Sequence, residues 1–225
     1  MNVAIVHYNT PALTSSAIRS LNKVTPGCHV TVFDNSNIRP FVNSFQNVDV
    51  IDNTQGKVID FKEMLSKYPD RQMERNRSNF GSAKHCKSVD VLMDIIPDGF
   101  LLLDSDVLLL RDVGGLCNDR KAVVGEEQKK CGVPLFCPFI CWINVPMLRS
   151  AGIRYFNGDK MWALSSEYPN NRYDTGAWLY EEVRRKGMPW ERVNIWDYII
   201  HFGHGSWKEK DTERWLNENE RLWRY

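Results

Sequence analysis

The sequence has no large excess of charge of either sign, no apolar run of membrane length and no Cys-x-x-Cys pair. Its 29 basic residues nearly balance its 28 acidic ones, so composition gives no reason to expect binding to nucleic acid or to an anionic membrane. No segment approaches the ~18 apolar residues of a membrane span, and no charged segment followed by a long apolar stretch stands at the start. We therefore expect a cytoplasmic protein, or a domain of a larger cytoplasmic protein.

A disulfide-stapled fold is not expected either. The cysteines include no Cys-x-x-Cys pair, and without a secretory signal free thiols are the simpler interpretation. The six cysteines are Cys28, Cys86, Cys117, Cys131, Cys137 and Cys141. A chain of 225 residues buries a sizeable core in one domain, and it shows no internal repeat or low-complexity segment.

Short β-type runs alternate with segments whose apolar residues have helical spacing. The expected strands cover residues 3–8, 30–33, 48–52, 100–110, 122–125, 139–145 and 195–200, and the expected helices begin near residues 11, 58, 81 and 173. This order predicts an α/β fold, with one Rossmann-like domain over residues 1–207 and a mixed, mostly parallel sheet flanked by helices. Residues 208–225 are expected to form an amphipathic helix that packs on this domain or connects it to a further one.

The apolar run Phe100–Leu110 contains two carboxylates, Asp104 and Asp106. Desolvating an unpaired carboxylate costs several kcal/mol, so something must neutralise the pair if this run is a buried strand. Residues two apart point to the same side of a strand, which lets both carboxylates address one cation where open α/β sheets bind ligands. The alternative is an Asp-rich turn between two short strands.

Polar residues follow the first two expected strands. His7, Tyr8, Asn9 and Thr10 form the rim of a strand-to-helix turn, with Thr10 as expected N-cap and Pro11 as first helical residue. A helix N-terminus at this place suits an anion or nucleotide, although an ordinary capped turn explains the same pattern. After the second strand, Asp34, Asn35 and Ser36 form a turn in which Asp34 could accept from a nucleobase N–H.

A basic segment precedes one of the expected helices, and a histidine follows the last expected strand. Residues 70–79, which include Arg77, are expected to form a basic loop before a helix start at Gly81, and this arrangement with Lys84 suits a diphosphate. Solvated arginines are the alternative. His201 comes directly after the last apolar strand and is followed by glycines that allow close backbone approach, so it is either a metal ligand or a structural histidine.

Asp174 has two interpretations, as the N-cap of the helix that follows or as a catalytic carboxylate. Trp142 and Trp178 could offer apolar faces to a sugar ring, and Asn144 is a polar residue in an otherwise apolar run.

In order and spacing these features resemble GT-A-fold glycosyltransferases, which use nucleotide-diphosphate sugars, and the resemblance spans nearly the whole chain. Residues 3–11 are similar to the first strand and turn of that family, and residues 33–36 to its base-recognition turn. Residues 79–85 resemble the helix start before its DXD motif, which Asp104-Ser-Asp106 matches, and His201 matches its late metal-binding histidine. The Lys-Pro-Trp ending of many retaining members is missing here.

The resemblance implies transfer of a hexose or deoxyhexose, of glucose or rhamnose type, from a UDP-sugar to a glycan acceptor. Asp104, Asp106 and His201 would hold the cation, and imidazole beside carboxylate favours Mn²⁺ over Mg²⁺. The implied nucleotide contacts are His7, Tyr8, Asn9, Thr10, Asp34, Asn35, Ser36, Arg77, Gly81, Lys84, Asp104 and Ser105. The implied sugar and acceptor contacts are Trp142, Asn144, Trp178, Gly205 and Ser206, with Asp174 at the anomeric carbon. The chain's size and immediate start also resemble the first domain of virus-encoded, multi-domain enzymes of capsid glycans, which implies further domains beyond residue 225.

Three other functions compete with this one. A haloacid-type phosphatase carries its DxD motif on the first strand, whereas residues 1–99 precede this one and no later Asp-Asp pair is placed to complete its magnesium site. A sugar-1-phosphate nucleotidyltransferase should begin with a Gly-rich, Arg-containing loop, unlike residues 7–11. A non-catalytic nucleotide- or glycan-binding domain is the remaining alternative.

Overall fold

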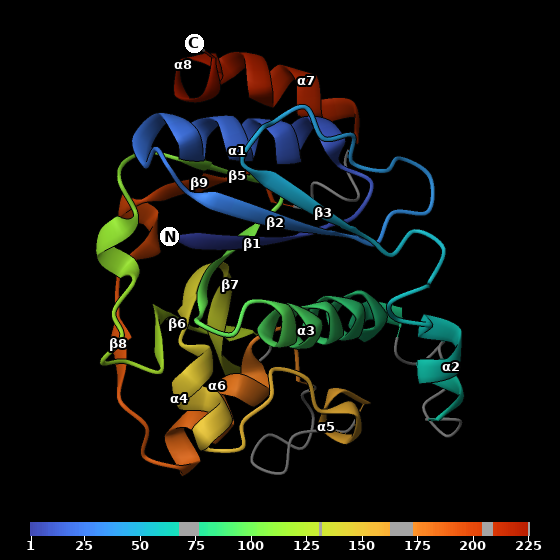
Figure 1. Cartoon of the computed structure of the whole chain (residues 1–225), viewed down its shortest axis with the longest axis vertical. Coiled ribbons are helices and arrows are strands. Elements are labelled where there is room, and N and C mark those ends of the chain that lie inside the picture. The colour runs from blue at the N-terminus through green and yellow to red at the C-terminus, as the bar shows by residue number, and fades with distance from the viewer. Residues whose placement is uncertain (68–76, 131, 163–172, 204–208, 225) are drawn as a thin grey trace.

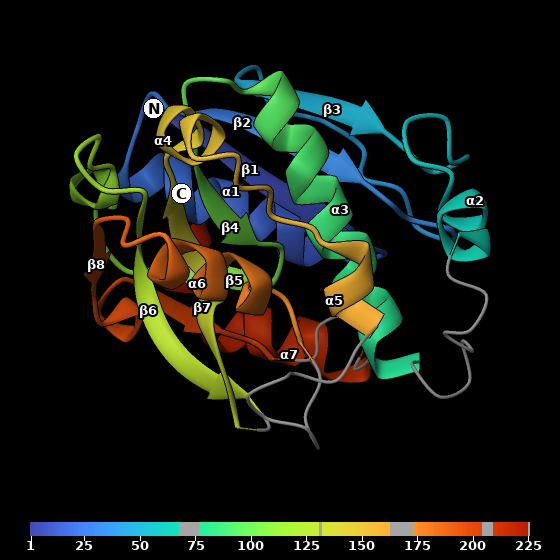
Figure 2. The same cartoon turned by 90° about the horizontal axis from the view of Figure 1, so that it is seen from below.

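A computed structural model describes residues 1–67, 77–130, 132–162, 173–203 and 209–224 of the chain. Its central sheet has seven strands in the order β3-β2-β1-β4-β7-β6-β8 (Figures 1 and 2). These strands are β1 Asn2–His7, β2 His29–Asp34, β3 Val48–Asp52, β4 Phe100–Asp104, β6 Val123–Lys130, β7 Val133–Ile143 and β8 Trp190–Arg192. The predicted α/β fold with a mixed, mostly parallel sheet is confirmed.

The first four strands of this order are parallel and end at one edge of the sheet. The register pairs His7 of β1 with Asp34 of β2, and Val6 with Asp104 of β4. The polar residues that follow these strands are therefore brought to one place, although the chain supplies them from three separate segments. β7 then pairs antiparallel with both β4 and β6, and β8 adds parallel to β6.

The apolar run Phe100–Leu110 forms two strands rather than one. β4 ends at Asp104, and β5, Val107–Leu109, belongs to a second sheet in which it pairs antiparallel with β9, Ile199–His201. The expectation of one continuous strand is wrong, and the alternative of an Asp-rich turn between two short strands is confirmed. Ser105 and Asp106 form this turn, which moves the chain from one sheet to the other.

Helices cover both faces of the central sheet. The helix α1, Pro11–Val24, lies on the face away from α3, Arg77–Ile95, and the sheet separates the two (Figure 1). Buried apolar residues form one core cluster on each side. The shorter helices are α2 Phe61–Ser66, α4 Val145–Ser150, α5 Gly158–Trp162 and α6 Ala177–Arg185, with 3₁₀ turns at Gly114–Leu116 and Ile195–Asp197.

The C-terminal helices α7, Glu209–Glu218, and α8, Glu220–Trp223, lie against the outer side of α1 (Figure 1). Lys23 of α1 donates to the carbonyl oxygens of Arg221 and Arg224 at 2.7 and 3.1 Å, and the Arg19 guanidinium lies 5.7 Å from the Trp223 ring centroid. The tail thus packs on the preceding domain, the first of the two expected arrangements. In the described residues no helix is long and apolar enough to cross a membrane.

Two helix starts differ from the sequence expectation. α3 begins at Arg77, four residues before Gly81, so Gly81 lies inside a helix instead of at its N-terminus. α6 has Gly176 as N-cap, and the interpretation of Asp174 as N-cap is wrong. Gly176 has φ +84°, and a Cβ there would lie 2.1 Å from the carbonyl oxygen of Phe136, so β7 and this turn approach too closely for any other residue.

Candidate metal centre and active site

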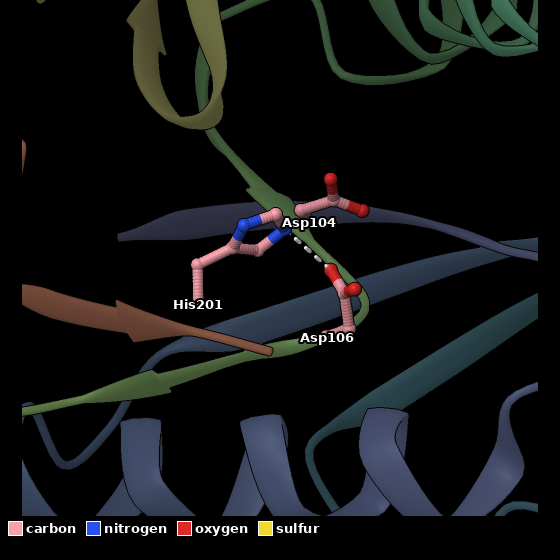
Figure 3. Close-up of side chains that lie close together, drawn as sticks. All are labelled: Asp104, Asp106 and His201. Carbon is pink, nitrogen blue, oxygen red and sulfur yellow. Dashed lines mark hydrogen bonds and ion pairs between the residues drawn. The ribbon is translucent and has the colours of Figure 1, made fainter. Parts of the chain in front are cut away.

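The centre of the site consists of Asp104, Asp106 and His201. Each offers one ligand atom, and these atoms lie within 4.8 Å of one another. Asp104 ends β4, Asp106 stands in the turn that follows, and His201 ends β9 (Figure 3). The antiparallel register pairs Val107 with His201, which brings the histidine next to Asp106. The fold thus brings together all three residues that the sequence suggested as metal ligands.

The electrostatics of this cluster fit a divalent cation. Burial and the neighbouring charge of Asp106 raise the pKa of Asp104 to about 7, against the smaller opposing effects of His201 and the Ser105 N–H. Burial alone would lower the pKa of His201, but its hydrogen bond to Asp106, 3.0 Å from Nε2 to Oδ1, and the charges of both carboxylates raise it. A cation held by two carboxylates and an imidazole would remove the repulsion between Asp104 and Asp106.

Thr10 and Ser105 join the first strand to this turn. Their hydroxyl oxygens lie 3.3 Å apart, and both residues are buried. The Thr10 side chain makes no hydrogen bond to the start of α1, so the expected N-cap contact is absent. The Ser105 N–H donates to Asp104 Oδ1 at 2.8 Å, which fixes the carboxylate at the strand end.

His7 and Asp34 are brought together inside the protein. Asp34 is 2% exposed, and its two oxygens accept from the backbone N–H groups of Ser36 and Phe41 at 2.8 and 2.7 Å. His7 is fully buried, with Nδ1 2.8 Å from the Thr14 hydroxyl. Burial lowers the pKa of His7 despite the opposing charge of Asp34. Both side chains stabilise the turns beside the site, and a direct contact of either with a nucleotide stays a prediction.

Asn9 organises the loop after β2. It is the one non-glycine residue of the described chain with positive φ, +57°, and its Oδ1 accepts from the backbone N–H groups of residues 37, 38 and 39 at 3.1–3.2 Å. Its own N–H donates to Ser36 Oγ at 2.9 Å. Asn35 is buried and donates to Ser88 Oγ of α3 at 2.7 Å. These three sequence-predicted residues therefore shape the rim by holding its backbone.

Lys84 of α3 is a half-buried cation among aromatic rings. Its ammonium group lies 4.5, 4.9 and 5.8 Å from the ring centroids of Phe80, Phe61 and Tyr8, respectively. No carboxylate within ion-pair distance is found for it in the described part of the chain. Burial lowers its pKa. A desolvated cation beside the end of β1 is well suited to an anionic ligand.

Asp174 lies between α3 and the β6–β7 hairpin, outside the metal cluster. Its carboxylate accepts from Ser82 Oγ and from the Thr175 N–H, and it forms an ion pair with Lys130 at 2.5 Å. Burial raises its pKa, but Lys130 and the hydrogen bonds outweigh burial, so the pKa is lowered and the group is ionised at neutral pH. Sequence reasoning gave no sign of Lys130, because the ion pair spans elements distant in the chain.

Two of the expected sugar contacts are structural. Trp142 is 5% exposed in the core, its Nε1 donates to the Asn118 carbonyl, and its ring edge lies against Gly99. Asn144 is the N-cap of α4 and accepts from the Met147 N–H at 3.2 Å. Neither offers a free surface to a sugar, which corrects the expectation from sequence. Trp178 on α6 is half-buried, with Lys160 Nζ 5.9 Å from its ring centroid.

Some expected contacts lie outside the described residues: Gly205, Ser206 and the side chain of Arg77. Two further residues of interest were not singled out from the sequence. Phe139 of β7 stacks on His201, and His85 of α3 has a buried Nε2 without a hydrogen-bond partner. His85 follows Lys84 in the segment that resembles the family's helix start, a signal that could have drawn attention to it. Phe139 stands in an apolar run that gives no such signal.

Comparison with solved structures finds glycosyltransferases. One is an active-site variant of the galactosyltransferase LgtC. The alignment covers 87% of this chain and 73% of the LgtC chain, with 14% sequence identity and a TM-score of 0.50. Another is the glycosyltransferase GlyE of Streptococcus pneumoniae. The alignment covers 95% of this chain and 50% of the GlyE chain, with 13% sequence identity and a TM-score of 0.50. The chain has a GT-A fold. No family model and no curated protein sequence matches it.

Within the GT-A fold, the Asp104-Ser105-Asp106 turn stands at the carboxyl end of a central strand, where open α/β sheets bind their ligands. Identities this low establish the shared fold, and the chemistry of this chain rests on its own residues.

Proposed function

We propose that the chain is a metal-dependent glycosyltransferase that moves a hexose or deoxyhexose from a UDP-sugar to a glycan acceptor. The observation that carries the proposal is the cluster of Asp104, Asp106 and His201 at the carboxyl end of β4 in a GT-A fold. Mn²⁺ is the expected ion, with Mg²⁺ as the alternative, since one of the three ligands is a nitrogen.

Transfer leaves a nucleoside diphosphate, so negative charge grows on the leaving phosphate oxygens as the bond to the sugar breaks. When bound, the cation supplies positive charge beside this leaving group. Asp104, Asp106 and His201 hold that charge in place. Lys84 adds a second cation from α3, and the aromatic rings around it restrict its position and exclude water.

Asp174 is proposed as the carboxylate on the sugar side of the site. It is ionised, and Ser82, Thr175 and Lys130 hold it in place. An ionised carboxylate with a lowered pKa is better suited to stabilising an oxocarbenium-like sugar than to taking up a proton. Asp174 lies apart from the metal cluster, which is consistent with the carboxylate facing the sugar of the donor while the cluster faces its diphosphate.

The base and sugar of the donor come from the resemblance. UDP is the expected nucleotide, and a glucose- or rhamnose-type sugar the expected cargo. Asp34 is already bound by two backbone N–H groups, so any base selection it exerts would act through the turn that it holds. A cytoplasmic location, a viral origin and further domains beyond residue 225 stay predictions.

The proposal is tested by incubating the protein with Mn²⁺, a panel of UDP- and GDP-sugars and a panel of glycan acceptors, followed by mass spectrometry. The expected result is an acceptor heavier by one hexose or deoxyhexose, with UDP-sugars preferred over GDP-sugars. Inorganic phosphate or sugar phosphate without transfer would indicate a phosphohydrolase. Donor binding without any product would indicate a non-catalytic binding domain.

A further inference from the structure

Phe139 packs face to face against the imidazole of His201. The two ring centroids lie 3.7 Å apart with an interplanar angle of 24°. Phe139 belongs to β7 of the central sheet, whereas His201 ends β9 of the small second sheet. This stack is therefore a contact between the two sheets at the metal cluster.

The contact matters because a metal-binding histidine needs a second constraint on its ring. In most proteins the ring nitrogen that does not bind the metal donates to a carboxylate or carbonyl, and this hydrogen bond sets the orientation of the ring. In the described part of the chain, His201 has one hydrogen bond, from Nε2 to Asp106, and none at Nδ1. Nε2 is the nitrogen that faces the carboxylates (Figure 3), and the Phe139 ring, stacked on the imidazole, constrains the plane of the ring.

Phe139 has a second aromatic neighbour. The Trp196 ring meets Phe139 edge to face, with centroids 6.1 Å apart at 66°. Asn194 accepts from the Trp196 N–H at 3.3 Å, which fixes the start of the 3₁₀ turn that carries the tryptophan. Phe139 thus contacts both the imidazole and a ring that is 46% exposed, and these two contacts restrict its movement relative to His201.

We propose that Phe139 is a positioning residue that holds the His201 ring so that Nε2 faces Asp104 and Asp106. The inference rests on the proposed metal site. A nitrogen ligand strengthens binding of Mn²⁺ more than binding of Mg²⁺, which prefers oxygen ligands. Phe139 consequently sets the preference of the site for Mn²⁺, although it touches no ion itself.

The test compares Mn²⁺ and Mg²⁺ dissociation constants, measured by calorimetry with and without UDP, in the intact chain. Phe139→Leu should weaken Mn²⁺ binding about 10- to 100-fold, the usual effect of losing a residue that orients a metal ligand. Mg²⁺ binding should weaken much less, so the ratio of the Mn²⁺ to the Mg²⁺ dissociation constant should rise toward that of His201→Ala. Phe139→Tyr keeps the ring and should keep the ratio. Phe156→Leu, at another half-buried phenylalanine, is the matched control and should change neither constant.

The outcomes separate the two claims. If the wild-type chain binds neither ion, the proposed metal site fails. If the wild-type chain binds Mn²⁺ and Phe139→Leu keeps the wild-type ratio, the metal site stands and the role of Phe139 is overturned. Should Phe139→Leu fail to fold, Trp196→Leu removes the outer support of Phe139 at a more exposed position. It should raise the ratio of the two dissociation constants by a smaller factor than Phe139→Leu, and an unchanged ratio there would also overturn the role.

Discussion

Asp106 and His201 are 95 residues apart in the chain, yet Nε2 of His201 lies 3.0 Å from Oδ1 of Asp106. The pairing of β5 with β9 creates this neighbourhood, because Val107 is the direct partner of His201 in the ladder. The small second sheet therefore contributes to the candidate metal site as much as the Asp104-Ser105-Asp106 turn does. If a cation binds there, metal binding should stabilise the folded state.

Mn²⁺ should raise the melting temperature of the wild-type chain and leave that of Asp106→Ala unchanged. An ion at a hundred times its dissociation constant stabilises the folded state by about 2.7 kcal/mol, which corresponds to roughly 5–10 °C for a chain of this size. Without metal, Asp106→Ala should still fold, because removing one of two repelling carboxylates offsets the loss of the His201 hydrogen bond. Asp98→Ala, at an exposed aspartate, is the control and should keep the wild-type shift. Equal shifts in wild type and Asp106→Ala would contradict the assignment.

Lys84→Met should weaken UDP binding in the presence of Mn²⁺ by about 10- to 100-fold, the range expected for losing a hydrogen bond between charged groups. Methionine fills the same space among Tyr8, Phe61 and Phe80, so the free energy of unfolding should stay the same or rise. Lys87→Met removes a cation one turn along α3 and is the control. Calorimetry that finds equal UDP affinity for the Lys84 and Lys87 variants would remove Lys84 from the donor site.

Asp174→Asn should keep donor and metal affinity but lose at least ~100-fold in transfer rate, the scale of a positioned catalytic group. Asparagine still accepts from Ser82 and Thr175, so the local structure should survive. Lys130→Met breaks the same ion pair and leaves the carboxylate, which separates loss of the pair from loss of the charge. Steady-state kinetics and melting temperatures of both variants give the answer. Full activity in Asp174→Asn would show that the carboxylate has no part in the reaction.

His85 should make the protein less stable in mild acid. Burial lowers its pKa to about 4, whereas an unfolded histidine titrates near 6.5. Between pH 6.5 and 4 the unfolded chain therefore binds a proton that the folded chain does not, and the free energy of unfolding falls as the pH decreases through this window.

The size of this effect is at most about 3 kcal/mol, from 1.36 kcal/mol per pKa unit. His85→Gln cannot take up the proton, so the difference in unfolding free energy between wild type and variant should change by that amount between pH 6.5 and 4. Urea unfolding across this range measures it. A difference that does not vary with pH would show that His85 is not shielded from protonation.

The sequence predicted the parallel half of the sheet well, because β1 has a continuous apolar run, β2 and β3 are rich in β-branched and apolar residues, and turn residues follow each strand. It also singled out the three residues that the fold brings together as a candidate metal site, since carboxylates in an apolar run and a histidine at a strand end are costly unless they serve a ligand. It left open whether the run is one strand or two short strands joined by an Asp-rich turn, and it did not predict that the two strands belong to different sheets. Composition cannot show this, because β4 and β5 are equally apolar.

Residues whose role depends on partners far along the chain were assigned less well. Trp142 and Asn144 have the chemistry of sugar contacts, but the core and the start of α4 use both. Asp34 has the chemistry of a base contact, yet two backbone N–H groups hold its oxygens. A residue type shows what a side chain is able to bind, whereas the fold decides whether that side chain is already bound.

The central claim is most directly tested by measuring UDP release from UDP-glucose and UDP-rhamnose with Mn²⁺, with a chelator, and in Asp106→Ala and His201→Ala. The account predicts release by the wild-type chain with Mn²⁺ that increases with a suitable glycan acceptor. It also predicts loss of that release with the chelator and in both variants, while each variant remains folded. Release at the wild-type rate in the chelator, or in either folded variant, would contradict the claim that Asp104, Asp106 and His201 form the metal centre of a glycosyltransferase.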